Sequence, residues 1–435
     1  MTSPESVSPA RRRAVIDALR RGTVPEAGLD LFAVGLDRFE QAIDAELDTV
    51  STGKAQFKAL RGEYGSGKTF FARWLAERAK RRDMASAEIQ ISETETPLHK
   101  LETVYRRLVE HLSTAAQPPS ALRAIIEGWF YILEEDVLEA DSIEDPSQLA
   151  QAVDALAEQR LASVARSTPA FSAALRAYRS ARLRGDDALA EGLLAWIGGQ
   201  PNVSAVVKRA AGVKGDLDHF GALGFLQGLL TVLRDSGHPG LLVVLDEIET
   251  LQRVRSDVRE KSLNALRQWM DEIDQGRFPG LYLLITGTPP FFDGTQGVQR
   301  APALAQRLAV DFADPRFDNP RAVQIRLHGF DLDKLELLGR AVRDLYAVDA
   351  TDRVHKVVDD EFIAELASAV TGGLGGRVGI APRLFLRKLV EDVLDRVDQF
   401  EDFDPRQHYQ LTIRSSELND MERNAASADD IDLSL

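Results

Sequence analysis

One eight-residue stretch constrains the fold of this chain more than any other feature. It reads Gly62-Glu63-Tyr64-Gly65-Ser66-Gly67-Lys68-Thr69, so a glycine is followed after four residues by Gly-Lys-Thr. Glycines let the backbone curl until several amides point at one phosphate, at the start of a helix whose dipole also favours anions. The stretch therefore predicts a strand, a phosphate-binding loop and a helix. In that loop Lys68 would reach the β- and γ-phosphates of ATP, and Thr69 would bind Mg²⁺.

A second apolar run ends in two carboxylates. Leu241 to Leu245 reads as a strand buried on both faces, and Asp246 and Glu247 follow it directly. Open α/β sheets bind ligands at the carboxyl ends of their strands, so we expect this pair beside the glycine loop. Asp246 would hold Mg²⁺ there, and Glu247 would orient and polarise the attacking water. An isolated Asp-Glu pair is ordinary surface chemistry, but coupled to the loop it favours ATP hydrolysis over passive binding.

Two threonines follow the next apolar run, Leu281 to Ile285. At the end of that strand, Thr286 and Thr288 lie where a hydroxyl contacts the γ-phosphate or the attacking water. The alternative is that they only form the turn, as threonines at strand ends commonly do. We retain Thr286 as a candidate site residue.

Several arginines are candidates for charge stabilisation during phosphoryl transfer. Arg307 either acts as an arginine finger on a neighbouring subunit or is a surface arginine, and Arg300 and Arg316 compete with it for the role. Arg383 begins a helix near the C-terminal end of the chain. It either folds over the nucleotide or makes a salt bridge at the helix start.

Strands that alternate with helices predict an α/β fold with a mostly parallel sheet covered on both sides. Residues 1–29 are expected to form an N-terminal helix and linker, and residues 30–330 a nucleotide-binding domain. A helical insertion is expected at about 115–235, and a C-terminal helical lid at 331–400. The polar, acidic residues 401–435 are expected to be a disordered tail.

Bulk properties exclude several other classes of protein. The chain has no cysteine, and its N-terminus lacks an apolar signal core, so a cytoplasmic protein without disulfides is expected. No apolar run approaches the ~20 residues of a membrane span. The net charge of -15 argues against a broad nucleic-acid surface. The basic clusters at Arg11 to Arg13, with Arg20 and Arg21, and at Lys80 to Arg82 are interpreted as solvated helix faces. The seven histidines show no metal-binding spacing.

The order of these motifs resembles the AAA+ superfamily of P-loop NTPases over residues ~30 to 400, nearest to its initiator and helicase-loader branch. A Val34-Gly35-Leu36-Asp37-Arg38-Phe39 box precedes the glycine loop, and the acidic pair, Thr286 and the two arginines follow in turn. The resemblance implies that Gly35 and its neighbours border the adenine. It also implies that Arg307 is the finger and that Arg383 is the sensor-2 arginine.

A narrower resemblance is to the BrxD family of BREX system ATP-binding proteins. Three parts of the chain carry it: Arg61 to Phe70, the strand end Ile91-Ser92-Glu93-Thr94, and the insertion sequences Tyr178-Arg179-Ser180-Ala181 and Trp196-Ile197-Gly198-Gly199. It implies an ATP- and Mg²⁺-dependent ATPase of a bacterial anti-phage defence locus, with Phe70 completing the nucleotide loop. A helicase and DNA are the implied partners. Initiators carry a winged helix after the lid, and here only ~35 residues follow residue 400, so sequence-specific DNA binding is in doubt.

Three functions compete on these observations. The first is an ATP-driven switch or loader. It would be oligomeric, because a finger supplied in trans requires a second copy of the chain. A STAND-like signalling switch would hold ADP and hydrolyse slowly, but such proteins usually append a sensor-repeat array. A nucleotide-stabilised scaffold would tolerate the loss of Lys68. Motif completeness favours the first function.

Overall fold

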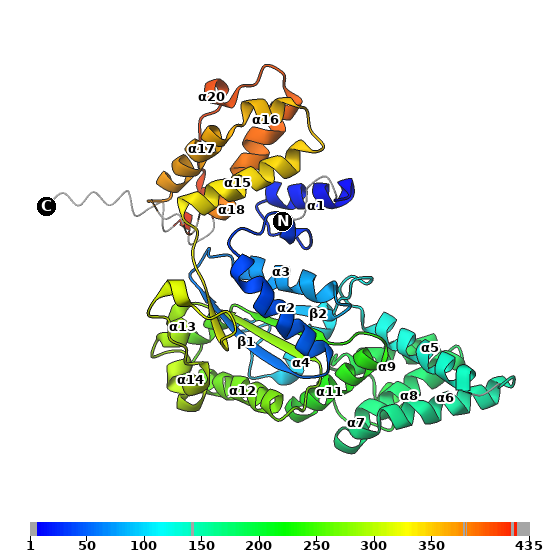
Figure 1. Ribbon diagram of the computed structural model, residues 1–435. Helices are drawn as coiled ribbons and strands as arrows, with labels where there is room; N and C mark the ends of the chain where they lie inside the picture. The colour runs from blue at the N-terminus through cyan, green and yellow to red at the C-terminus, as the bar shows by residue number, and fades with distance from the viewer. Residues whose placement is uncertain (1–6, 141–142, 377–378, 380, 419–421, 424–435) are drawn as a thin grey trace.

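Figure 1 shows the computed structural model of the protein, which describes residues 7–140, 143–376, 379, 381–418 and 422–423. A sheet flanked by helices occupies the centre, a helical insertion extends to one side, and the C-terminal helices form a separate layer above the sheet. Within the described residues, no helix is both long and apolar enough to cross a membrane.

A five-stranded parallel sheet positions the residues that the motifs singled out. Its strands are β1 (Gln56–Gly62), β2 (Ala85–Gln90), β3 (Leu241–Asp246), β4 (Leu281–Gly287) and β5 (Gln324–Leu327). They lie in the order β2-β3-β4-β1-β5, and each neighbouring pair is parallel. The carboxyl ends of all five strands therefore share one edge, which brings the segments after β1, β3 and β4 together. The predicted α/β fold with a parallel sheet is confirmed.

Helices bury both faces of this sheet. In β1, Phe57 and Ala59 belong to the core on one face, and Leu60 belongs to the core on the other. The first core is completed by α4 (Leu101–His111), α11 (His219–Asp235) and α12 (Ser256–Asp274). The second core is completed by α2 (Asp37–Ser51) and α3 (Lys68–Lys80). Between β4 and β5 the chain forms the short helices α13 (Pro289–Asp293) and α14 (Pro302–Leu308).

The helical insertion between α4 and α11 is continuous with the first core. It comprises α5 (Leu122–Ala140), α6 (Pro146–Arg160), α7 (Ala162–Ser167), α8 (Pro169–Leu183), α9 (Asp187–Ile197) and α10 (Ala205–Ala210). At the junction, the ring of Phe225 makes edge-to-face contacts with Tyr105, Phe171 and Trp196 at centroid distances of 5.9, 5.3 and 5.3 Å. Because these rings come from α4, α8, α9 and α11, the insertion is packed onto the sheet layer.

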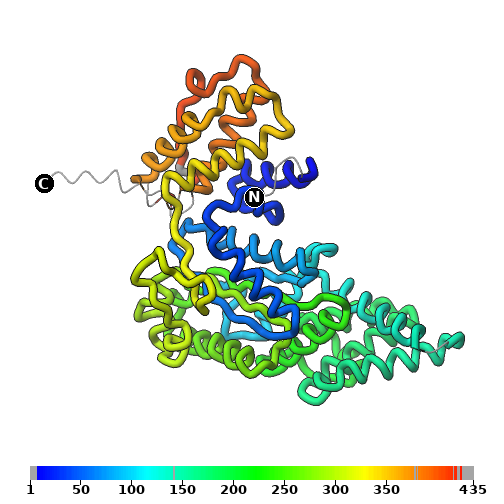
Figure 2. The backbone as a smooth tube through the Cα atoms, viewed as in Figure 1, coloured from blue at the N-terminus to red at the C-terminus, as the bar shows by residue number. Residues whose placement is uncertain are grey.

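The C-terminal helices form a layer that shares its core with α2 and α3. They are α15 (Leu332–Ala347), α16 (Arg353–Val357), α17 (Asp360–Gly372), α18 (Pro382–Arg387), the π-helical η7 (Lys388–Leu394), and α19 (Asp395–Gln399). Figure 2 shows the segment after β5 running from the sheet into this layer.

The first helix of the chain packs on this C-terminal layer. In α1 (Pro9–Arg20), Val15 and Leu19 are buried in the same core. The Arg12 Nε donates to Asp349 at 2.9 Å, and the Arg20 Nε pairs with Asp395 at 2.6 Å. These arginines are thus paired with carboxylates of the layer, where the sequence predicted a solvated helix face. The N-terminal helix joins opposite ends of the chain into one layer.

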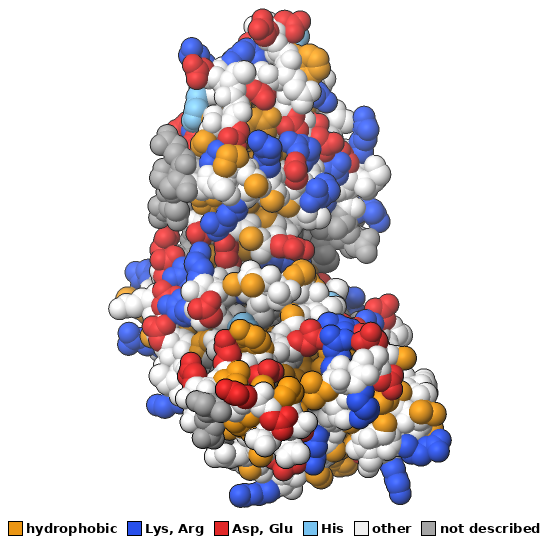
Figure 3. All heavy atoms as spheres, turned by 90° about the vertical axis from the view of Figure 1, so that its right-hand side faces the viewer, with side chains coloured by type: hydrophobic (Ala, Val, Ile, Leu, Met, Phe, Trp, Pro, Cys, Tyr) orange, Lys and Arg blue, Asp and Glu red, His pale blue; other side chains and the backbone are white. Residues whose placement is uncertain are grey.

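Charge is mixed on the visible surface. On the face in Figure 3, basic and acidic side chains are interspersed over both the C-terminal layer and the insertion side. The second basic cluster is also neutralised locally, because Arg81 pairs with Asp30 and Arg82 pairs with Asp48. This face offers no broad basic surface, in line with the net charge of -15.

Part of the segment predicted to be a disordered tail is ordered. Residues 401–418 include α20 (Pro405–His408), and Leu418 is buried in the core of the C-terminal layer. Composition alone indicated disorder because the segment is acidic, but its few apolar residues pack on the layer. Of the remaining tail, residues 419–421 and 424–435 lie outside the described residues.

Candidate functional site

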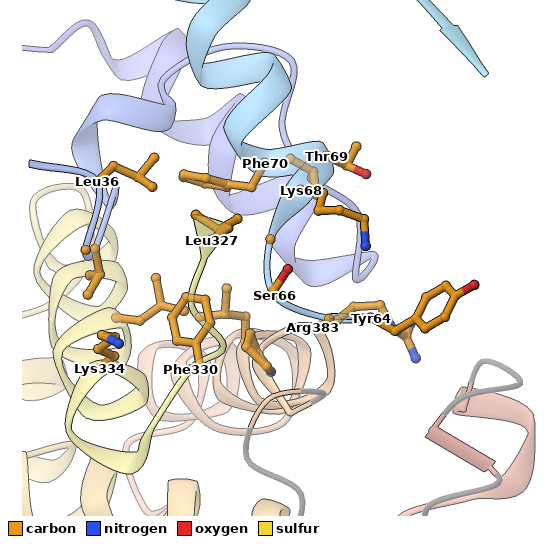
Figure 4. A pocket seen from close by; sticks show the side chains of 18 of the residues that line it. Leu36, Tyr64, Ser66, Lys68, Thr69, Phe70, Leu327, Phe330, Lys334 and Arg383 are labelled. Atoms are coloured by element: carbon orange, nitrogen blue, oxygen red, sulfur yellow. The ribbon is translucent and has the colours of Figure 1, made fainter. Parts of the chain in front are cut away.

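A cavity of about 500 Å³ lies at the shared carboxyl edge of the strands, beneath the C-terminal layer. Five stretches line it, drawn from residues 19–39, 64–70, 246–249, 327–338 and 382–386, together with Glu422. Figure 4 shows Leu36, Leu327 and Phe330 at one end of the cavity and Tyr64, Lys68 and Thr69 at the other. The volume of the cavity and its division into an apolar and a polar end suit one ligand of the size of a nucleotide.

The glycine loop has the conformation that its sequence predicted. Gly65 and Gly67 have φ values of +77° and +91°, in the left-handed region that favours glycine. A Cβ added to Gly62 would lie 2.3 Å from the Ser66 Oγ, so a side chain there would force Ser66 to move. The loop leads directly into α3, and the first amides of a helix have no partner within it. A helix start of the kind that can bind an anion therefore lies at the wall of the cavity.

Lys68 is held inside the loop. Its Nζ donates to the carbonyl oxygens of Gly62 at 3.0 Å and Glu63 at 3.2 Å, and it lies 5.1 Å from the centre of the Tyr64 ring. Gly62 and Glu63 thus act through their carbonyls and do not line the cavity. Burial lowers the pKa of the Lys68 ammonium, and the charges of Glu249 and Asp246 oppose this shift. A phosphate would supply the strong acceptor that this buried cation lacks.

The fold brings Thr69 and Asp246 together. The Thr69 Oγ1 donates to the Asp246 Oδ2 at 3.1 Å, and the Thr286 Oγ1 donates to the Asp246 Oδ1. Asp246 and Thr286 are both buried. A hydroxyl beside a fixed carboxylate provides the hard oxygen donors that Mg²⁺ prefers. No group of three or more His, Cys, Asp or Glu in the described part of the chain could hold a metal, so any Mg²⁺ here would also need phosphate or water ligands.

Glu247 has an unusual backbone and a specific partner. Its φ of +58° is in the left-handed region, which a non-glycine residue rarely adopts. The backbone N–H donates to the Asp246 Oδ1 at 3.0 Å and to the Thr286 Oγ1 at 3.3 Å, and these bonds hold the turn. The side-chain Oε2 accepts from the Gln90 Nε2 at 2.8 Å. Strained turns of this kind cluster at functional sites.

Gln90 and Glu249 are site residues that sequence reasoning missed. Gln90 is the last residue of β2, and this position at the carboxyl end of a strand was the only sequence signal that could have identified it. Glu249 lies in the 3-10 turn Ile248–Gln252 and is 5% exposed, and its two carboxyl oxygens accept no hydrogen bond from any other described residue. Burial raises the pKa of the Glu249 carboxyl, and the charge of Lys68 opposes the rise. Glu249 therefore adds a third acidic group to this end of the cavity.

The other end of the cavity is apolar. Gly35 lies on its wall with a φ of +79°, close to the aliphatic part of Lys334. Leu327, at the end of β5, and Phe330, just after it, line the same end. The Phe70 ring lies at 5.2 Å from that of Phe32, edge to face. Gly35 was expected at this end and Phe70 in the nucleotide loop, whereas Leu327 and Phe330 carried no motif that could have identified them.

Of the candidate arginines, Arg383 reaches the cavity. It lies in the first turn of α18, and its guanidinium pairs with Glu422. Arg307 lies on α14 and pairs with Asp271 of α12 at 2.6 Å, outside the cavity. Arg300 and Arg316 do not line the cavity either, and Arg316 pairs with the neighbouring Asp314. Within one chain, the structure does not bring Arg307 to the glycine loop.

Comparison with known proteins gives one match. Residues 7–413 match the model of the family described as BREX system ATP-binding protein BrxC/D. A search of curated proteins found no match. The matched residues include every cavity-lining segment except the one that carries Glu422.

Proposed function

The chain belongs to the BREX system ATP-binding protein BrxC/D family, and from this premise we propose that it is a BrxD-type AAA+ ATPase that binds Mg-ATP in the cavity and hydrolyses it. One observation supports this above all others. Thr69, at the start of the helix that follows the glycine loop, bonds to Asp246 at the end of β3, 177 residues away in the chain. Two motifs that are far apart in sequence thereby meet at one point, next to the buried Lys68.

The residues have distinct roles in this proposal. The loop amides and Lys68 bind the β- and γ-phosphates, because the buried ammonium would exchange two carbonyl acceptors for stronger anionic ones. Thr69 and Asp246 would hold Mg²⁺, which when bound neutralises charge on the phosphate oxygens. Thr286 fixes Asp246 through its hydroxyl. Glu247 accepts the proton of the attacking water, and it lies on a turn that its own backbone bonds hold in place.

The architecture fits an AAA+ division of labour. In this proposal, residues 30–330 form the nucleotide-binding domain with its insertion at about 115–235, and residues 331–400 form the lid. The apolar end of the cavity, between Gly35 and Phe330, holds the adenine. Arg383 approaches the phosphates from the lid. Membership of the BrxC/D family supports a role in BREX anti-phage defence, where we propose an oligomeric switch or loader that acts with a helicase or DNA.

Oligomerisation is proposed from the position of Arg307. In its own chain it pairs with Asp271 and lies outside the cavity, so a finger role requires a neighbouring subunit. Light scattering with Mg-ATP and DNA should detect the oligomer. Arg307→Ala should reduce ATP turnover by about 10³-fold while leaving ATP affinity unchanged. A protein that stays monomeric under these conditions would remove the basis for the trans finger.

Calorimetry tests the nucleotide site directly. Wild-type protein titrated with Mg-ATP should show one saturable site per chain, and Lys68→Ala should abolish the heat. Lys261→Ala, on the exposed side of α12, removes the same charge elsewhere and serves as the matched control. The proposal fails if the wild-type protein gives no heat, or if Lys68→Ala binds as tightly as the control.

A further inference from the structure

Arg383 is already bound by an anion of its own chain. Its Nε donates to the Glu422 Oε1 at 2.9 Å, and its Nη2 donates to the Glu422 Oε2, so the contact is bidentate. The same Nη2 also donates to the carbonyl oxygen of Glu417 at 2.5 Å. The other terminal nitrogen, Nη1, lies against Gly22, where an added Cβ would come within 3.2 Å of it. The cavity arginine is thus engaged from the C-terminal side and bordered by the N-terminal segment.

The carboxylate that binds Arg383 occupies the cavity itself. Glu422 is among the lining residues, and its side chain is 1% exposed. A bidentate pair between guanidinium and carboxylate has the same geometry as a pair between guanidinium and phosphate. Glu422 therefore presents to Arg383 the kind of acceptor that a nucleotide phosphate would present.

The preceding segment is fixed to the C-terminal layer at further points. The Glu417 Oε1 accepts from the Lys388 Nζ at 2.9 Å, and its Oε2 accepts from the Arg414 backbone N–H at 2.9 Å. Leu418 is 7% exposed and belongs to the core of the layer. These anchors place the segment close to Arg383. The family match ends at residue 413, so Arg414, Glu417 and Leu418 all lie beyond it.

From these contacts we propose that Glu422 is an intramolecular competitor of the nucleotide phosphates, and that Glu422 and residues 414–418 restrain the site until ATP displaces them. This inference rests on the proposed function, because it requires that ATP binds in the cavity. The Nε and Nη2 edge of Arg383 cannot hold both anions at once, so a phosphate that takes this edge releases Glu422.

The contact between Glu422 and Arg383 should weaken ATP binding by a measurable amount. When only a fraction of the molecules has Arg383 available, the apparent dissociation constant for ATP rises by the inverse of that fraction. Glu422→Gln preserves the size of the side chain but removes its charge. We expect it to bind Mg-ATP about tenfold more tightly than wild type, which corresponds to an available fraction of about one tenth in the wild-type protein.

Calorimetry on the full chain, with Mg-ATP as the probe, tests the competition. Glu391→Gln is the matched control, because Glu391 forms an ion pair with Arg387 on the same layer but does not line the cavity. The control should bind ATP as wild type does. In an Arg383→Ala background, Glu422→Gln should change ATP affinity by less than about twofold, because the competed partner is gone. An unchanged or weakened affinity in Glu422→Gln alone would overturn the inference.

Hydrogen exchange on the wild-type chain provides a second test that needs no variant. The Glu417 N–H donates to the Arg414 carbonyl at 2.9 Å, and release of the segment would expose this amide. Saturating Mg-ATP should speed exchange in peptides that cover residues 414–418. Exchange that stays the same or slows would contradict the release. If wild type binds no Mg-ATP at all, the proposed function fails as well; if it binds but Glu422→Gln is unchanged, only this inference fails.

Discussion

The two ends of the cavity are built in different ways. The polar end comes from the carboxyl edge of one sheet, where Lys68, Thr69 and Asp246 are held by hydrogen bonds to one another and to loop carbonyls. The apolar end is assembled from two separate parts of the chain, the segment after α1 and the residues after β5. The first end is held by hydrogen bonds at the edge of one sheet, whereas the second depends on how the C-terminal layer sits on the sheet.

Because the two ends are built differently, we expect substitution of Glu247 at one end to change mainly ATP turnover and substitutions at the other end to change mainly ATP affinity. At the polar end, Lys68 binds phosphates of the ground state, but Glu247 acts only on the attacking water, so changes at Glu247 should act mainly on the rate of chemistry. Groups that enclose the base contribute equally to the ground state and the transition state. Changes there should act mainly on ATP affinity. Variants at each end can therefore test the division.

The largest effect is expected for Glu247→Gln at the polar end. Glutamine keeps the shape and the turn but cannot accept the proton of the attacking water, so ATP turnover should fall by about 10³-fold. The dissociation constant for Mg-ATP should stay within about threefold of the wild-type value, because Glu247 is not proposed to bind phosphate. Phosphate release under saturating ATP and calorimetry measure the two quantities.

The control for this variant is Glu260→Gln, an exposed carboxylate of α12. It should leave both turnover and affinity unchanged. Turnover that survives in Glu247→Gln would remove Glu247 from the proposed chemistry and would break the division between the two ends.

A smaller effect, on ATP affinity and not on turnover, is expected for Phe330→Ala at the apolar end. Stacking of a base on an aromatic ring is worth about 1–3 kcal/mol, so ATP affinity should weaken by about tenfold. Turnover at saturating ATP should be unchanged. Phe317→Ala removes a ring that is 77% exposed and serves as the control. A fall in saturated turnover with unchanged affinity would show that the ends do not divide their functions in this way.

The polar end could be predicted from the sequence because its information is local. The glycine spacing from Gly62 to Gly67 specifies a loop whatever the rest of the chain does, and a buried parallel strand places Asp246 at the same edge. The parallel α/β sheet followed from the same strand pattern. Thr286 was identified by its position at a strand end, and the structure adds its bond to Asp246.

The apolar end could not be predicted in the same way. Phe330 follows a four-residue strand and has no spacing signal, and its place on the cavity wall depends on tertiary packing. Glu422 lies in a segment whose acidic composition indicated disorder, and only its contact with Arg383 reveals a role. Arg12 and Arg20 read as a solvated face because their partners Asp349 and Asp395 are more than 300 residues away in the chain.

Gln90→Leu should give the smallest effect and the finest test of the contrast. The Gln90 Nε2 donates to the Glu247 Oε2 at 2.8 Å, so one carboxylate oxygen of Glu247 is occupied by this bond. Losing that bond should leave the oxygen free to accept from the attacking water and raise basal ATP turnover by about threefold, with affinity unchanged. Gln151→Leu, exposed on α6, is the matched control and should behave as wild type. If turnover falls instead, Gln90 must hold Glu247 in its productive position. In that case the polar end would depend on β2 as well as on the strands that carry the motifs.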